Sequence, residues 1–245
     1  MLSGGSAFGL DAASGAMQYL EEKGIGFDMK TVKVPIVCGA SLFDLQVGDP
    51  FTRPDKAMGY EACMHVKEQF QEGNYGAGCG CSIGKVAGPE FAMKSGIGAY
   101  ALELGDLQIG AIVAVNACGD IMNLNHEIIG AANINGNLVS TEQLFMQAMT
   151  MPQGNTTIGC IITNAKLDKA MANKLATMTH DAYAHVITPT HTMADGDTIF
   201  TMCHGDVEAD INLLGVLAVK CMEQAIINGF QKAKSAYGLS AYTEK

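Results

Sequence analysis

Three short segments that are expected to be strands constrain the fold of this chain more than any other feature, and the first of them is a continuous apolar run. They are "IGAIVAV" at 109–115, "IGCIIT" at 158–163 and "TIFTM" at 198–202. A strand that is apolar along its whole length is covered on both faces, unlike a strand in which polar residues alternate. We therefore expect a sheet of buried strands with helices packed over it, an α/β sandwich.

Apolar residues at helical spacing predict the helices that would cover such a sheet. A first helix follows the turn "GGSAFG" and stops at Gly24, and others are expected near 56–70, 168–186 and 212–234. A further strand is expected at 32–37, and residues 123–153 are polar and predicted to be an exposed connector. With 245 residues, of which 48% are hydrophobic, the chain is long enough to form this core as a single domain.

The charge balance excludes several classes of partner. The net charge is −10 and only 15 residues are Lys or Arg, which argues against nucleic acid and against anionic membrane surfaces. No run of about 18 apolar residues is present, and the first residues, "MLSGGSAFGLDAASG", lack the features of a signal peptide. We expect a cytoplasmic protein that does not associate with membranes.

Two further features of the composition predict an oligomer with reduced cysteines. The charged fraction is only 16%, so we expect neighbouring copies to cover part of the surface of a homo-oligomer. The eight cysteines are interpreted as small buried residues, because a cytoplasmic chain of this length needs no disulfides. Cys79 and Cys81 have no second pair at zinc-ligand spacing, so no metal or cofactor is expected.

The stretch "GNYGAGCGCSIGKVAG" at 73–88 holds six glycines and one charged residue, Lys85. So much backbone freedom is costly unless close backbone approach requires it. Lys85 is either a solvated loop lysine or a donor to negative charge that develops on an oxygen during a reaction. Asn116, directly after the strand at 109–115, either caps that strand or directs its amide into a site.

The stretch "GNTTIGC" places Asn155, Thr156 and Thr157 between a turn and a strand. The plainer interpretation is a turn whose threonines suit β structure. "NTT" also matches a glycosylation sequon, which requires secretion. The alternative is self-cleavage: the Thr156 hydroxyl attacks the Asn155 carbonyl, and hydrolysis of the ester frees Thr156 as a new N-terminus. An N-terminal amine ordinarily has a pKa of about 7.7–8.0, so the freed amine of Thr156 could take the proton of its own hydroxyl.

The stretch "ADGDT" places Asp195 and Asp197 two residues apart. In an extended segment both carboxylates face the same side, where they could hold an ammonium group or orient a hydroxyl. Spacing alone is equally typical of a polar turn. With His191 and His204 on either side, a metal-dependent hydrolase is a third possibility.

Six motifs in order resemble one family. They are "LSGGSAFGLDAASGAMQYLEEKGIGF", "VPIVCGASLFDL", "RPDKAMGYEAC", "GAGCGCSIGKVAG", "VNACGD" and "NTTIGCIITNA". Together they resemble the DmpA-type peptidases, which include L-aminopeptidase/D-esterases, β-peptidyl aminopeptidases and nylon-oligomer endohydrolases. The resemblance implies an αββα sandwich of the DmpA/ornithine acetyltransferase type, and self-cleavage into residues 1–155 and 156–245. It also favours a tetramer.

The resemblance assigns roles residue by residue. Thr156 matches the nucleophile, Lys85 and Asn116 match polar residues of the site, and Asp195 with Asp197 matches its carboxylate pair. Thr at the cleavage point with Asp-x-Asp looks closer to the nylon-oligomer branch than to the aminopeptidases. Moving the start of the strand by one residue would turn the hydroxyl to the other face, and the family spacing favours Thr156 over Thr157.

The chain departs from the family pattern at two points. Family members carry several dozen residues before "LSGGSAFGL", so we expect an N-terminal strand to be absent here. The aminopeptidase branch also uses a tyrosine at its site, for which Tyr60 and Tyr75 are both candidates.

The expected function is therefore a self-processing amide hydrolase, an aminopeptidase or an amide-oligomer hydrolase, that acts on a small peptide or amide. Two alternatives stay open: acyl transfer to an amine by the same fold, and an unprocessed homologue that only binds or assembles.

Overall fold

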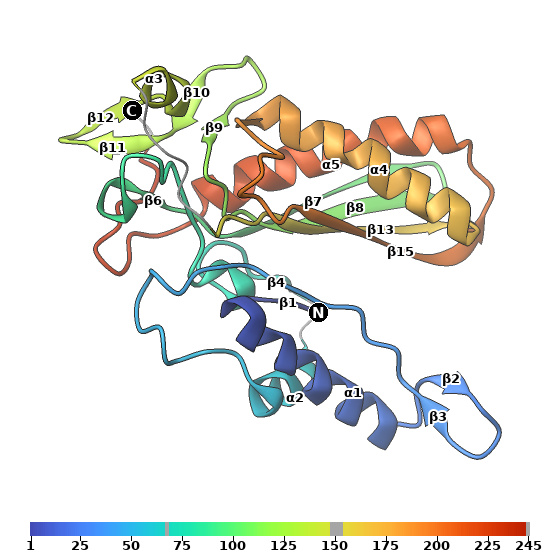
Figure 1. Cartoon of the computed structure of the whole chain (residues 1–245). Coiled ribbons are helices and arrows are strands. Elements are labelled where there is room, and N and C mark those ends of the chain that lie inside the picture. The colour runs from blue at the N-terminus through green and yellow to red at the C-terminus, as the bar shows by residue number, and fades with distance from the viewer. Residues whose placement is uncertain (67–68, 148–153, 244–245) are drawn as a thin grey trace.

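A four-stranded sheet forms the centre of the computed structural model, which describes residues 1–66, 69–147 and 154–243 (Figure 1). Its strand order is β15-β13-β8-β7, with β13 parallel to β15 and antiparallel to β8. These strands are β7 (Ile97–Leu104), β8 (Leu107–Ala114), β13 (Ile158–Ala165) and β15 (Thr198–Val207). The three expected apolar strands are thus neighbours in one sheet.

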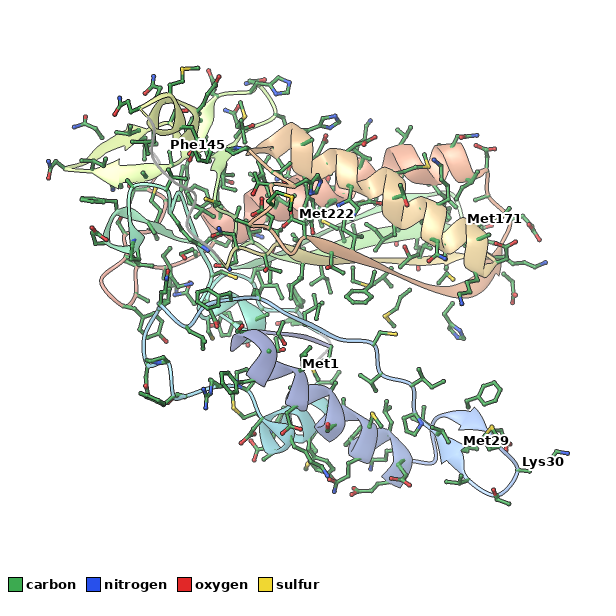
Figure 2. The ribbon with its side chains drawn as sticks, in the orientation of Figure 1. Met1, Met29, Lys30, Phe145, Met171 and Met222 are labelled. Atoms are coloured by element: carbon green, nitrogen blue, oxygen red, sulfur yellow. The ribbon has the colours of Figure 1, made fainter. Side chains whose placement is uncertain are left out.

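Two long helices cover one face of this sheet (Figure 1). They are α4 (Lys169–Val186) and α5 (Ile211–Gln231), and each begins where an aspartate side chain, Asp168 or Asp210, accepts hydrogen bonds from the first-turn amides. Met222 of α5 is fully buried and points toward the sheet (Figure 2), and Gly159 of β13 leaves room for its terminal methyl. The main core lies between these helices and the strands.

Helix α5 is long and apolar. By length and composition alone it could cross a membrane, with a mean hydropathy of 1.4. It packs instead on β7, β8 and α4, and a buried core helix satisfies the same test.

Glycine-rich segments and two further helices lie on the opposite side of the sheet from α4 and α5 (Figure 1). The helices are α1 (Ala12–Glu22), preceded by a 3₁₀ helix (Ser6–Asp11), and α2 (Lys56–Met64). Between them and the main sheet lies the short strand pair β1 (Leu2–Ser3) with β4 (Ala40–Ser41), whereas β5 (Ser82–Ile83) pairs with β6 (Met93–Lys94), which lies to one side of the main sheet (Figure 1). The order of layers is helices, short strands, main sheet and helices.

The remaining elements are short. They are β2 (Phe27–Asp28), β3 (Lys33–Val34), β9 (Asp120–Met122), β10 (Ile128–Gly130), β11 (Ala132–Ile134), β12 (Asn137–Val139), β14 (Ile187–Thr188), α3 (Thr141–Met146) and 3₁₀ turns at Gly76–Gly78 and Pro89–Phe91.

Several expectations about elements were wrong. Residues 123–147 form short strands and a helix rather than a plain connector, and residues 148–153 lie outside the described residues. The strand expected at 32–37 is limited to β3, which pairs only with β2 in an exposed hairpin. The helix expected to reach residue 70 ends at Met64. Strand β7 was not anticipated, because its residues alternate between exposed and half-buried beyond Gly98.

Candidate active site

The bond between Asn155 and Thr156 lies at the entrance to β13, where the chain joins the sheet. Asn155 forms a parallel β-bridge with Asp195. Its amide donates to the Ala194 carbonyl (3.2 Å), and its own carbonyl accepts from the Gly196 amide (2.8 Å). Two backbone hydrogen bonds therefore fix the carbonyl that self-cleavage would attack.

Thr156 is half-buried, and its hydroxyl lies against that same carbonyl. Its Oγ1 donates to the Asn155 carbonyl oxygen at 2.6 Å. A Cβ at Gly196 would lie only 2.9 Å from Thr156 Oγ1, so a glycine is needed at this position for the close approach. The Thr157 side chain, in contrast, is fully buried on the other face. The geometry favours Thr156 over Thr157 as the nucleophile.

Lys85 and Asn116 lie directly beside the Thr156 amide. The Thr156 N–H donates to the Asn116 carbonyl (3.1 Å), and Lys85 Nζ donates to the same carbonyl (3.2 Å) and to Asn116 Oδ1 (2.7 Å). The Thr156 amide nitrogen and the lysine Nζ thus share one acceptor. Lys85 is 6% exposed, so the solvated-loop interpretation was wrong.

Both polar atoms of the Asn116 side-chain amide make hydrogen bonds within the protein. Its Nδ2 donates to the Phe43 carbonyl (2.8 Å), and its Oδ1 also accepts from the Ser82 amide (3.2 Å). Asn116 therefore ties together β5, the loop at Phe43 and Lys85. Of the two side chains expected to stabilise an oxyanion, Lys85 is the better placed donor.

Burial sets the charge state of Lys85. Removal from water lowers the pKa of its ammonium to about 8, and the nearby Asp195 and Asp44 carboxylates counteract this only in part. Near neutral pH this lysine is charged, but it loses its proton more readily than an exposed lysine.

Asp195 forms the β-bridge with Asn155 and Asp197 directly precedes β15, so both carboxylates follow the turn at 193–194 and flank Thr156. Asp197 Oδ1 accepts the N–H of Thr157 (2.9 Å), the residue after the nucleophile. Asp195 Oδ2 accepts from the amide and hydroxyl of Thr192 (2.8 and 2.7 Å). Burial raises the pKa of Asp195. These hydrogen bonds connect the two carboxylates to Thr157 and Thr192 rather than to the Thr156 hydroxyl.

Tyr183, a tyrosine that the sequence did not single out, bonds to the residue after Thr156. Tyr60 donates to Glu22 between α1 and α2, and Tyr75 is exposed. Tyr183 of α4 is fully buried, and its hydroxyl donates to the Thr157 carbonyl (3.3 Å). On sequence alone, Tyr183 reads as an ordinary core residue of an amphipathic helix.

The metal-site alternative finds little support in the arrangement of donors. Within residues 1–66, 69–147 and 154–243, no three His, Cys, Asp or Glu side chains are grouped so that they could hold a metal ion. His191 contacts Asp197 (2.9 Å), whereas His204 is exposed on β15.

A cavity of about 370 Å³ adjoins Lys85. Ser82, Glu90 and Tyr237 also line it, so it opens between the glycine-rich stretch and the C-terminal segment. A second cavity of about 560 Å³ shares Val47 and Tyr237 with the first and is mainly apolar. The two provide adjoining space next to the lysine for part of a substrate.

Comparison with known proteins places this geometry in a family. The model of peptidase family S58 matches residues 1–243. An uncharacterized aminopeptidase of Mycobacterium tuberculosis is 32% identical over 271 aligned positions, which cover 100% of this chain and 77% of the relative. A 6-aminohexanoate-oligomer endohydrolase of Agromyces sp. is 28% identical, over 92% of this chain and 69% of the relative.

Solved structures share the fold at low sequence identity. A protein of Pyrococcus horikoshii OT3 superposes with a TM-score of 0.68 at 20% identity, over 97% of this chain, and the chain spans 66% of that structure's length. The L-aminopeptidase D-Ala-esterase/amidase of Ochrobactrum anthropi, described as a variant of the Ntn hydrolase fold, gives 0.67 at 17% identity, over 98% of this chain and 69% of its own. The chain has the Ntn hydrolase fold, an α/β sandwich, and it belongs to peptidase family S58, a family of amide hydrolases.

Proposed function

We propose that this chain cuts itself between Asn155 and Thr156 and then hydrolyses small peptides or linear amides with Thr156 as the nucleophile. The observation that carries the proposal is the position of Thr156 Oγ1, 2.6 Å from the Asn155 carbonyl oxygen, which the Gly196 amide holds from another direction. The names of the aminopeptidase and oligomer-hydrolase relatives support the substrate class.

Self-cleavage would proceed as an acyl shift. Thr156 Oγ1 attacks the carbonyl carbon of Asn155, and the negative charge that forms on the Asn155 oxygen is stabilised by the Gly196 N–H. The C–N bond breaks, and the nitrogen takes the proton lost by the hydroxyl, which leaves an ester between Asn155 and Thr156. Water hydrolyses this ester and releases Thr156 with a free amine.

The free amine would then act as the base. Anchored to the Asn116 carbonyl, it directs its lone pair away from that acceptor. The charge of Lys85 on the same acceptor disfavours a second positive charge and keeps the amine neutral. The amine takes the proton of Oγ1, which attacks the substrate carbonyl.

Lys85 would stabilise the oxyanion that this attack produces. Such a donor is worth about 10²- to 10³-fold in rate. The proton passes to the departing substrate amine, and water hydrolyses the acyl ester and regenerates Thr156. The cavity next to Lys85 provides space for the substrate.

Mass spectrometry of the denatured protein tests this proposal. The wild type and Thr156→Ser are expected to yield fragments 1–155 and 156–245, and Thr156→Ala is expected to stay intact and inactive toward a chromogenic alanine anilide. Thr157→Val is the matched control. It removes a buried hydroxyl for which the described residues offer no hydrogen-bond partner, so cleavage should persist at the same bond. Cleavage or full turnover in Thr156→Ala contradicts the proposal.

A further inference from the structure

The Asp197 carboxylate makes hydrogen bonds with residues that have no role in the proposed mechanism. One of its oxygens, Oδ1, accepts the Thr157 N–H. The other, Oδ2, accepts from the Thr190 hydroxyl (3.0 Å) and lies 2.9 Å from Nδ1 of His191. Only one of the two oxygens therefore faces the nucleophile strand, and the other is fixed by the loop at 190–191.

His191 has a backbone conformation that indicates a specific requirement. Its φ is +56°, in the left-handed region, which is unfavourable for a residue with a side chain by about 1 kcal/mol. This conformation is retained although a glycine would adopt it freely. The side chain must therefore make contacts that compensate for the backbone.

The His191 ring is fixed by two rings of α4. It stacks on Tyr183, with centroids 5.8 Å apart and planes 21° apart, and meets His180 edge-on at 4.9 Å. His180 and Tyr183 lie three residues apart, on one face of the helix. Burial and the nearby His191 lower the pKa of His180, so its ring is neutral at neutral pH and adds no competing charge.

These contacts converge on the backbone of one residue, Thr157. Tyr183 donates to the Thr157 carbonyl, while Asp197 accepts the Thr157 amide. The residue directly after the nucleophile is thus held at both its polar backbone atoms by a unit of three side chains: His191, Asp197 and Tyr183. Thr156 takes its position from this peptide.

We propose, on the basis of the function proposed above, that His191 is a positioning residue of the active site. It donates from Nδ1 to Asp197 while its ring rests on Tyr183, and so it holds the carboxylate against Thr157 and fixes the Thr156 hydroxyl for attack. This hydrogen bond requires the ring form that carries a proton on Nδ1, and the ring faces Asp195, Asp197, His180 and Tyr183.

The test compares two replacements that both accept a left-handed backbone. His191→Gly removes the donor and the ring without backbone strain, and His191→Asn keeps a donor on a residue that tolerates this conformation. His126→Gly is the matched control, because His126 also has a left-handed φ of +62° and is exposed in the β9–β10 turn.

We expect His191→Gly to slow self-cleavage, and to lower kcat on a chromogenic alanine anilide, by about 10- to 100-fold with KM unchanged. His191→Asn should recover most of this loss, and added imidazole should restore part of the rate of His191→Gly. His126→Gly should behave as the wild type. Backbone amide NMR provides a second readout, in which the Thr157 N–H signal shifts in His191→Gly and returns toward its wild-type position in His191→Asn.

The outcomes separate this inference from the proposed function. If Thr156→Ala stays intact while His191→Gly cleaves at the wild-type rate, the role of His191 is wrong and the proposed nucleophile stands. A slow His191→Gly that neither Asn nor imidazole restores also contradicts it. If Thr156→Ala cleaves normally, the proposed function is wrong, and the Thr157 signal alone decides whether His191 supports that peptide. Should His191→Gly fail to fold, His191→Asn with a wild-type Thr157 signal but 10-fold lower turnover would refute the positioning role.

Discussion

The two sides of the active site are ordered by different kinds of interaction. In the sheet covered by α4 and α5, the large buried side chains are apolar, for example Phe230, Leu214 and Met222. The glycine-rich layer consists of residues 1–9, 38–48 and 73–96. In this layer, buried cations contribute to packing the interior alongside apolar side chains. Lys94 is fully buried and donates to the carbonyls of three residues: Gly78, Cys81 and Ser95.

The difference shows what the glycines do. Asp44 occupies space that side chains at Gly4 and Gly80 would fill, since a Cβ at either position would lie 2.2 Å from its Oδ2. Chain segments without side chains expose backbone groups, and charged residues can satisfy these groups where apolar residues cannot. Thr156 lies at the end of the sheet that is ordered by apolar packing, and Lys85 lies in the glycine-rich layer. The candidate site therefore forms at the boundary between the two regions.

The largest effect that tests this contrast is expected from Phe230→Ala. Phe230 is fully buried in the main core, and its removal should lower the free energy of unfolding by about 4–5 kcal/mol. Urea denaturation measures this. Val216→Ala on the exposed side of the same helix should cost less than about 0.5 kcal/mol. A small effect of Phe230→Ala would show that apolar packing does not dominate this half.

A somewhat smaller effect is expected from Lys94→Met. Three buried carbonyls lose their donor, so the free energy of unfolding should fall by about 3–4 kcal/mol despite the gain in apolar character. Lys166→Met breaks an exposed ion pair with Glu208 and should leave the free energy of unfolding nearly unchanged. If Lys94→Met is as stable as the wild type, the buried cation is not what orders the glycine-rich layer.

The smallest effect concerns pH and has opposite signs for stability and activity. The pKa of Lys85 is about 8 in the folded chain, whereas the ordinary pKa of a lysine is 10.5, so between these pH values the unfolded chain binds more protons. The free energy of unfolding should therefore rise with pH across this window, by no more than about 3 kcal/mol. Turnover should fall over the same window, because neutral Lys85 stabilises an oxyanion poorly.

Lys85→Met supplies the control for this prediction. The difference in unfolding free energy between wild type and Lys85→Met, measured from pH 7 to 11, isolates the contribution of this lysine. An identical pH dependence in both proteins would show that Lys85 does not titrate near pH 8.

The sequence predicted the central sheet well because its signal is local. A continuous apolar run identified β8, strand-like segments identified β13 and β15, and capping aspartates mark the starts of α4 and α5. The short strands at 120–139 were missed, because pairs of two or three residues depend on their partners rather than on their own composition.

The candidate site was predicted in part, for a related reason. Lys85, Asn116, Thr156, Asp195 and Asp197 all lie together, as the resemblance implied. Their partners could not be inferred: the Gly196 amide is a backbone group, and Tyr183 and His191 become neighbours only through tertiary packing of α4 against the loop before β15. The precise role of each carboxylate likewise depends on a turn that spacing alone does not determine.

The hydrogen bond from Gly196 to the Asn155 carbonyl has a consequence for what the mature protein would recognise. If the chain is cut as proposed, that carbonyl can move away, and the Gly196 amide that held it is left without an internal partner. The vacated amide could then donate to the carbonyl of a substrate. A substrate would bind best if its carbonyl made the same hydrogen bond that the Asn155 carbonyl makes in the uncut chain.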